Sequence, residues 1–149
     1  MTAQDLVIRP IEPQDKAEWR RLWTAYLDFY ETTVPEEVYE ETFRRLIGEG
    51  EFEPNGFLAL KGGKPVGLVH YIQHRHCWMT QNACYLQDLY ADPEVRGIGI
   101  GRALIEAVYK RADELGLGRV YWLTQEHNAT ARRLYDRIAH NTNFIRYMR

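Results

Sequence analysis

The segment DPEVRGIGIGRAL, residues 92–104, decides the fold of this chain. It follows an apolar run that ends at Ala91, and it predicts a proline-containing turn, a glycine-rich corner and the start of a helix. Glycine adopts backbone conformations that a side chain forbids, and it lets a ligand approach the backbone closely. The first turn of a helix has free N–H groups and the positive end of the helix dipole, which suit a phosphate. We therefore expect a phosphate-binding corner with the rest of the chain as its frame.

Composition indicates one soluble domain that spans residues 1–149. The chain has 45% hydrophobic and 27% charged residues, which is ordinary for a globular protein. No apolar run approaches the ~18–20 residues of a spanning helix, and the first residues do not have the pattern of a signal peptide. A net charge of −2 and two cysteines, Cys77 and Cys84, favour a cytoplasmic protein without a nucleic-acid or membrane partner.

Hydrophobic periodicity predicts ten elements in the order strand, two helices, three strands, helix, strand, helix, strand. This order is typical of an α/β fold with a mixed, mostly antiparallel sheet and helices on both faces. The expected strands are residues 6–11, 57–61, 66–74, 84–91, 120–124 and 144–148. The expected helices are residues 15–30, 35–47, 97–115 and 128–138. Nothing in the sequence indicates an internal repeat or a domain boundary.

Two familiar phosphate-binding motifs do not fit the glycine-rich corner. A P-loop needs a Lys-Ser/Thr pair after its second glycine, and none follows here. A dinucleotide fingerprint that starts at Gly97 and Gly99 needs a third small residue where Arg102 stands. The corner is therefore neither a P-loop nor a dinucleotide fingerprint.

A third motif fits: Arg96-x-x-Gly99-x-Gly101, between a strand and an amphipathic helix, resembles the acetyl-CoA-binding motif of the GCN5-related N-acetyltransferase (GNAT) family. The preceding strand YLQDLYADP, residues 85–93, is similar to the family strand before the loop. The segment NATARRLY, residues 128–135, is similar to the second cofactor segment of the family. Within the family, the similarity is greatest to small diamine or polyamine and histone acetyltransferases.

The resemblance implies acetyl-CoA as cofactor and coenzyme A as product. It implies that backbone N–H groups of the corner hold the pyrophosphate, and that the end of the preceding strand pairs with the pantetheine arm. Asn128 is expected to cap the last helix and to contact this arm. The implied cofactor-binding residues are Leu89, Tyr90, Ala91, Arg96, Gly97, Ile98, Gly99, Ile100, Gly101, Arg102, Ala103, Asn128 and Tyr135. No metal site is predicted.

The resemblance also assigns a catalytic role to Tyr135, and Asp88 is a second candidate catalytic residue that it does not assign. Tyr135 matches the family tyrosine near the cofactor sulfur, so it is the implied general acid for the departing thiolate. Gln87 stands where polyamine acetyltransferases have a glutamate, and it cannot accept a proton at neutral pH. Asp88 is the next candidate, although strand alternation predicts that it points to the face opposite Gln87. The base remains open among Asp88 and the residues Glu126, His127, His70 and His74.

The acceptor site is expected over the first two helices. Residues 28–53 contain nine acidic residues and two arginines, a net charge of −7 that leaves +5 on the rest of the chain. With Tyr26 and Tyr30, and with Gln87 on the strand, this region predicts a site for a cationic small-molecule or peptide amine. An equally simple interpretation of the acidic residues is the solvated side of a helix.

The predicted activity is acetyl transfer to a primary amine by direct attack in a ternary complex, because no nucleophile lies in the cofactor motifs. The alternative is an acyl-CoA sensor without turnover, which the glutamine at position 87 would favour. Family habit implies a homodimer.

Overall fold

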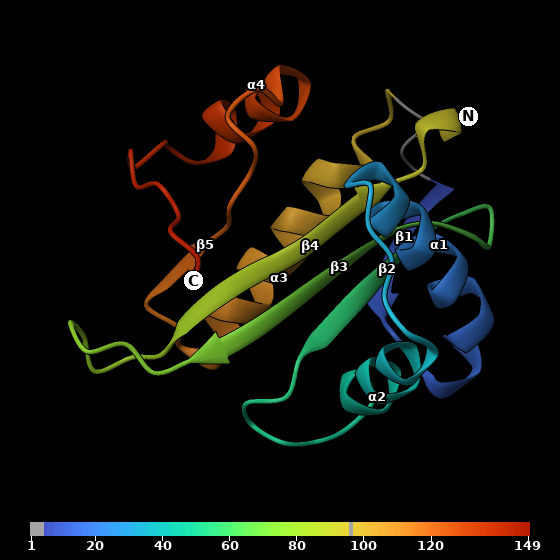
Figure 1. Cartoon of the computed structure of the whole chain (residues 1–149), viewed down its shortest axis with the longest axis horizontal. Coiled ribbons are helices and arrows are strands. Elements are labelled where there is room, and N and C mark those ends of the chain that lie inside the picture. Colours follow the sequence, from blue (N-terminus) through green and yellow to red (C-terminus); the bar gives the residue numbers. More distant parts are fainter. Residues whose placement is uncertain (1–4, 96) are drawn as a thin grey trace.

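The protein forms a mixed sheet with helices on both faces, as the sequence predicts, and the sheet has five strands where the sequence predicts six (Figure 1). The structure is a computed structural model that describes residues 5–95 and 97–149. The strands are β1 (Leu6–Pro10), β2 (Asn55–Lys61), β3 (Lys64–His74), β4 (Ala83–Ala91) and β5 (Arg119–Tyr121), in this spatial order. The helices are α1 (Lys16–Phe29), α2 (Glu36–Leu46), α3 (Ile100–Leu115) and α4 (Ala129–Ile138), with short 3-10 turns at Pro13–Asp15 and Pro93–Val95. Strands β1 to β4 are antiparallel, and β5 runs parallel to β4.

Two hydrophobic clusters hold the layers together, one on each face of the sheet. The cluster under α1 and α2 includes Trp19, Leu22 and Phe43 together with Leu58 and Leu68 of the sheet. The cluster on the other face joins α3 and α4 to the sheet, and Leu104, Ile105 and Val108 of α3 are fully buried in it. Because successive side chains of a strand point to opposite faces of the sheet, each strand contributes residues to both clusters.

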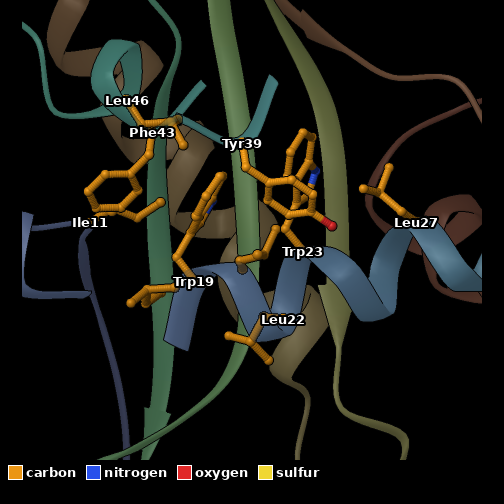
Figure 2. Close-up of a cluster of buried hydrophobic side chains, with 10 residues drawn as sticks. Ile11, Trp19, Leu22, Trp23, Leu27, Tyr39, Phe43 and Leu46 are labelled. Carbon is orange, nitrogen blue, oxygen red and sulfur yellow. The ribbon is translucent and has the colours of Figure 1, made fainter. Parts of the chain in front are cut away.

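Helix α1 forms because its apolar residues recur at intervals of three and four, which places them on one face. Figure 2 shows these side chains directed at the sheet, with Phe43 and Leu46 of α2 beside them. Trp19 and Trp23 stack with ring centroids 5.2 Å apart. The interpretation of this aromatic stripe as core is confirmed, although two of its members also have polar partners that are described below.

The predicted closing strand at residues 144–148 is wrong. Residues 139–149 form no helix or strand, and Phe144, Ile145 and Tyr147 have exposed fractions of 82%, 75% and 88%. High β-propensity gives a strand only where the segment pairs with a neighbouring strand. β5 is the edge strand and is three residues long, and the tail does not pair with it, so the tail side chains remain exposed.

The strand predicted at residues 120–124 is also displaced, because β5 ends at Tyr121. Residues 122–124, the rest of the predicted strand, lead away from the sheet toward α4 (Figure 1). In the part of the chain that the structure describes, no helix is long and apolar enough to cross a membrane.

Candidate active site

Strand β4 has a different neighbour along each half of its length. β5 pairs with β4 only from Ala83 to Tyr85, and the two strands then diverge (Figure 1). Beyond this point the 86–91 half pairs with β3 on one side, while the chain after β5 turns away toward α4. Since successive residues of a strand direct their N–H and C=O groups to opposite edges, alternate residues of this half face the diverging side. This is the arrangement in which an extended ligand can pair with a strand.

The glycine-rich corner follows directly after this half of β4. Gly97 and Gly99 have φ angles of 87° and 76°, a left-handed conformation that favours glycine. Gly99 is the N-cap of α3, and the first helical hydrogen bond runs from the Ala103 N–H to the Gly99 carbonyl at 2.9 Å. The backbone N–H groups of Ile100, Gly101 and Arg102 therefore precede the helical ladder. This geometry can bind a phosphate, as the sequence predicts.

Other predicted cofactor residues precede or follow these N–H groups in the sequence, and Arg102 carries one of them. Arg96 lies outside the described residues. The Arg102 guanidinium forms an ion pair with Glu106 at 2.7 Å, so this side chain lies along the exposed side of α3. The Ala103 N–H belongs to the helix, which leaves only its methyl group for a ligand. Leu89 and Ala91 pack toward α3, and Tyr90 packs toward α1.

Tyr135 lies on α4, the helix that Asn128 caps. The Asn128 side chain accepts a hydrogen bond from the Ala131 N–H at 3.4 Å, which confirms the predicted cap. Tyr135 is half-buried and packs edge-on against Trp122, with ring centroids 5.3 Å apart. Burial, with a smaller effect from Tyr30, raises the pKa of Tyr135 to about 12. The hydroxyl therefore keeps its proton at neutral pH and can act as a proton donor.

A pocket of about 650 Å³ opens on the opposite side of β4, under α1 and α2. It brings together all three residues that the sequence assigns to the acceptor, Tyr26, Tyr30 and Gln87, and it adds Asp88. The remaining polar lining includes Arg45, Glu53 and His70. Tyr30, which lines this pocket, also contributes to the raised pKa of Tyr135 on α4.

A β-bulge places Gln87 and Asp88 at the same pocket. His70 of β3 lies opposite Asp88, and Tyr71 lies opposite Leu86, so Gln87 is an extra residue on β4. The bulge breaks the alternation of the strand: Leu86 faces α3, whereas Asp88 faces α1. The prediction that Asp88 points to the face opposite Gln87 is therefore wrong. The prediction assumed strict alternation along β4, which holds only for a strand without an extra residue.

Asp88 is a buried carboxylate with three hydrogen-bond donors. Its Oδ2 atom lies 2.8 Å from Nδ1 of His70 and 3.3 Å from Nε1 of Trp23, and Tyr26 also hydrogen-bonds to it. Burial by itself would raise the pKa of Asp88, but the bonds from His70, Tyr26 and Trp23 lower it below the usual value. The carboxylate is therefore ionised at neutral pH. Burial and the nearby Asp88 charge raise the pKa of Tyr26, which stays protonated.

The other candidate bases lie elsewhere or have structural partners. His74 bonds to the Tyr121 hydroxyl at 2.7 Å, and Glu126 and His127 are exposed in the loop before α4. Burial raises the pKa of the Cys84 thiol to about 11, so this cysteine does not supply a thiolate nucleophile.

Most of the acidic excess of residues 28–53 does not line the pocket. Glu36 forms an ion pair with Arg20 at 2.6 Å, and Glu40 pairs with Lys16. Of the acidic residues in this range, the pocket lining includes only Glu53. The interpretation of these glutamates as a solvated helix face agrees better with the structure than an acidic rim does.

Sequence reasoning did not identify Trp19 and Trp23 as polar partners, because their spacing is that of a core stripe. The Trp19 Nε1–H donates to His70 at 2.9 Å, and Trp23 donates to Asp88. The available signal was His70 itself, a histidine inside the apolar run VGLVHYI of residues 66–72. A buried histidine requires hydrogen-bond partners, and an indole N–H is one of the few donors on an otherwise apolar helix face.

Comparison with known proteins agrees with this geometry. Residues 19–140 match the acetyltransferase (GNAT) family. The D-amino-acid N-acetyltransferase HPA3 of Saccharomyces cerevisiae is 39% identical over 100% of this chain and 93% of that protein. The thialysine N-epsilon-acetyltransferase of Caenorhabditis elegans is 30% identical over 56% of this chain and 52% of its own length. The aminoglycoside N-acetyltransferase AAC(6')-Iy, solved in complex with CoA, has the same fold, with a TM-score of 0.82 at 17% identity over 97% of this chain and 93% of that one.

The fold and the matched residues define an acetyltransferase. The chain belongs to the GNAT family, as the resemblance of its glycine-rich corner implies. Members of this family use acetyl-CoA as the acetyl donor.

The bulge gives a prediction that compares loss of the Gln87 side chain with loss of the whole residue. Gln87→Ala removes an exposed side chain, so we expect the free energy of unfolding to change by less than about 0.5 kcal/mol. Deletion of Gln87 makes Leu86 and Asp88 consecutive residues, so regular alternation keeps them on their observed faces opposite Tyr71 and His70, and we expect a loss of less than about 1.5 kcal/mol. Urea denaturation of both variants measures the two changes. A loss of more than about 3 kcal/mol on deletion would show that β4 needs the extra residue to hold Leu86 and Asp88 in place.

Proposed function

We propose that this chain transfers the acetyl group of acetyl-CoA to the primary amine of a cationic small molecule or lysine side chain, by direct attack in a ternary complex. The observation that carries the proposal is the ionised, buried Asp88 carboxylate in a pocket on the strand that leads to the glycine-rich corner. The named relatives favour amino acids as acceptors, because they act on D-amino acids and thialysine. A cytoplasmic location and a homodimer stay predictions.

The residues of the corner fit the cofactor. The N–H groups of Ile100, Gly101 and Arg102 would bind the pyrophosphate at the positive end of α3, and the 86–91 half of β4 would pair with the pantetheine arm. A backbone N–H on this half of β4 is also in a position to stabilise an oxyanion. When bound, acetyl-CoA supplies the thioester that an amine attacks.

The acceptor pocket offers both signs of charge. Asp88 supplies a negative group for an ammonium ion, and Tyr26 and Tyr30 supply aromatic surface beside it. Arg45 lines the same pocket and could pair with a carboxylate, although it already contacts Glu41 at 3.2 Å. An amino acid carries both an ammonium and a carboxylate, so this lining supports an amino-acid acceptor over a simple amine.

The low pKa of Asp88 suits it to bind an ammonium ion and makes it a poor acceptor for the proton of that ion. A carboxylate that stays ionised holds a cation well but is a weak base. The amine must lose a proton before it attacks, and Gln87 cannot accept this proton. Asp88 would then orient the amine, and the proton would leave to solvent water.

Acceptor choice tests the proposal directly. We expect release of the coenzyme A thiol with a D-amino acid, a diamine or a lysine-containing peptide, and a kcat/KM at least about tenfold higher than for an uncharged primary amine of similar size. The reason is the loss of the ion pair with Asp88. Equal efficiency on the uncharged amine would remove the cationic acceptor from the proposal. Binding of acetyl-CoA with no thiol release for any amine would support a sensor instead.

Removal of the Tyr135 hydroxyl tests the general acid. We expect Tyr135→Phe to lower kcat by about 10²-fold with little change in KM, because the departing thiolate loses its proton donor. Tyr147→Phe is the matched control, since this tyrosine is 88% exposed on the tail. Steady-state kinetics of both variants decide the matter, and an unchanged kcat in Tyr135→Phe would assign the proton to another donor.

A pair of glycine variants separates cofactor binding from backbone strain. Gly99 and Gly116 both have φ near 70°, and both have open space around the missing Cβ atom. We expect Gly99→Ala and Gly116→Ala to lose similar stability, about 1–2 kcal/mol each. Only Gly99→Ala should weaken coenzyme A binding, because its strain displaces the first N–H groups of α3. Thermal unfolding and calorimetric titration measure the two effects, and equal affinities would contradict the assignment of the corner.

A further inference from the structure

Three buried groups form a line of hydrogen bonds from α1 to β4. The Trp19 Nε1 atom lies 2.9 Å from Nε2 of His70, and Nδ1 of the same ring lies 2.8 Å from Oδ2 of Asp88. Their exposed fractions are 0%, 3% and 8%. The sequence offers His70 only as one of several candidate bases, and the helical spacing accounts for Trp19 only as a core residue.

The direction of these bonds follows from the chemistry of the indole. An indole N–H is only a donor, so Nε2 of His70 must accept and can carry no proton. The single ring proton then lies on Nδ1, where it points at Asp88. A proton on Nε2 would place two N–H groups against each other at 2.9 Å. Trp19 therefore holds His70 in its neutral Nδ1–H form.

The groups that contact this pair are neutral, and Arg45 and Glu53 are the charged residues elsewhere in the pocket lining. From α1, Trp23 and Tyr26 donate to Asp88 without adding charge. From α2, Tyr39 packs edge-on against Trp19, and its hydroxyl bonds to Thr24 at 2.8 Å.

Strand β2 contributes Gly56 directly opposite His70, where an added Cβ would lie 3.2 Å from the imidazole Cδ2 and 2.5 Å from Ile11. The ring therefore has little room to turn. Among the residues that the structure describes, the hydrogen bonds to this pair come from Trp19, Trp23 and Tyr26, which are neutral donors, so with a neutral ring the group as a whole has one negative charge.

We propose that Trp19 sets the charge of the acceptor pocket: its N–H keeps His70 neutral, so that Asp88 offers an uncancelled negative charge to the ammonium group of the acceptor. A protonated His70 would neutralise Asp88 and leave a salt bridge with no attraction for a cation. Trp19 and His70 are thus positioning residues that act through Asp88. This role rests on the proposed function, because it presupposes an amine acceptor.

The first measurement needs no substrate. Long-range ¹H–¹⁵N correlation spectra of the ¹⁵N-labelled protein at pH 7 should show His70 as the neutral Nδ1–H tautomer. Trp19→Phe keeps most of the buried volume but removes the donor, and we expect it to give a mixture that includes the charged ring or the other tautomer. Trp23→Phe is the matched control, because it removes an indole one turn along the same helix that does not bond to His70. Its His70 signals should remain those of the wild type.

The second measurement uses the acceptor. Trp19→Phe should raise KM for a cationic amine by about tenfold, with kcat within about threefold and no change in KM for an uncharged amine. The double variant Trp19→Phe/His70→Asn should restore KM, because an asparagine amide can donate to Asp88 but cannot become charged.

The proposal is overturned if wild-type His70 carries its proton on Nε2 or is charged, or if Trp19→Phe leaves the tautomer unchanged. It is also overturned if the double variant fails to recover KM while it remains folded. Should Trp19→Phe fail to fold, the wild-type spectrum still decides the tautomer. Absence of turnover with every amine would instead reject the proposed function. The spectra would still decide the tautomer of His70, because they need no substrate.

Discussion

The buried charge of Asp88 is the constraint on which the rest of the site depends. A carboxylate with an exposed fraction of 8% is unfavourable unless donors surround it, and the protein supplies these donors from two directions. Helix α1 contributes Trp23 and Tyr26, and strand β3 contributes His70. The position of α1 on the sheet is therefore fixed by hydrogen bonds as well as by the packing of its apolar face. Removal of one donor would leave the charge without compensation, which is why such groups are sensitive to substitution.

Much of the fold follows from local sequence patterns. The glycine-rich corner was predictable because positive φ angles need glycine, and Gly97 and Gly99 have them. Period and turn signals placed α1 to α4 and β1 to β4, and Asn128 was recognisable as a helix cap. The pairing of residues 26, 30 and 87 in one pocket followed from family resemblance, since nothing local connects α1 to β4.

The rest depends on information that is not local. The bulge at Gln87 arises from the register between β3 and β4, so alternation along β4 alone gave the wrong face for Asp88. The tail at residues 144–148 has the composition of a strand, but a strand also needs a neighbour with which it pairs, and composition does not show where the segment lies relative to the sheet. The polar roles of Trp19 and Trp23 were hidden because an indole is both a large apolar group and a hydrogen-bond donor. Periodicity detects the first property and is blind to the second.

The divergence of β4 and β5 has a geometric consequence for catalysis. One strand presents its edge to the donor side, while one of its faces carries Asp88 toward the acceptor side. The edge and the face belong to the same few peptide units and point in perpendicular directions. The backbone geometry therefore fixes the distance between groups bound at the edge and groups bound at the face. On the function proposed here, their approach would be set by bond lengths and strand pleat, and a closing movement of domains would be unnecessary for alignment.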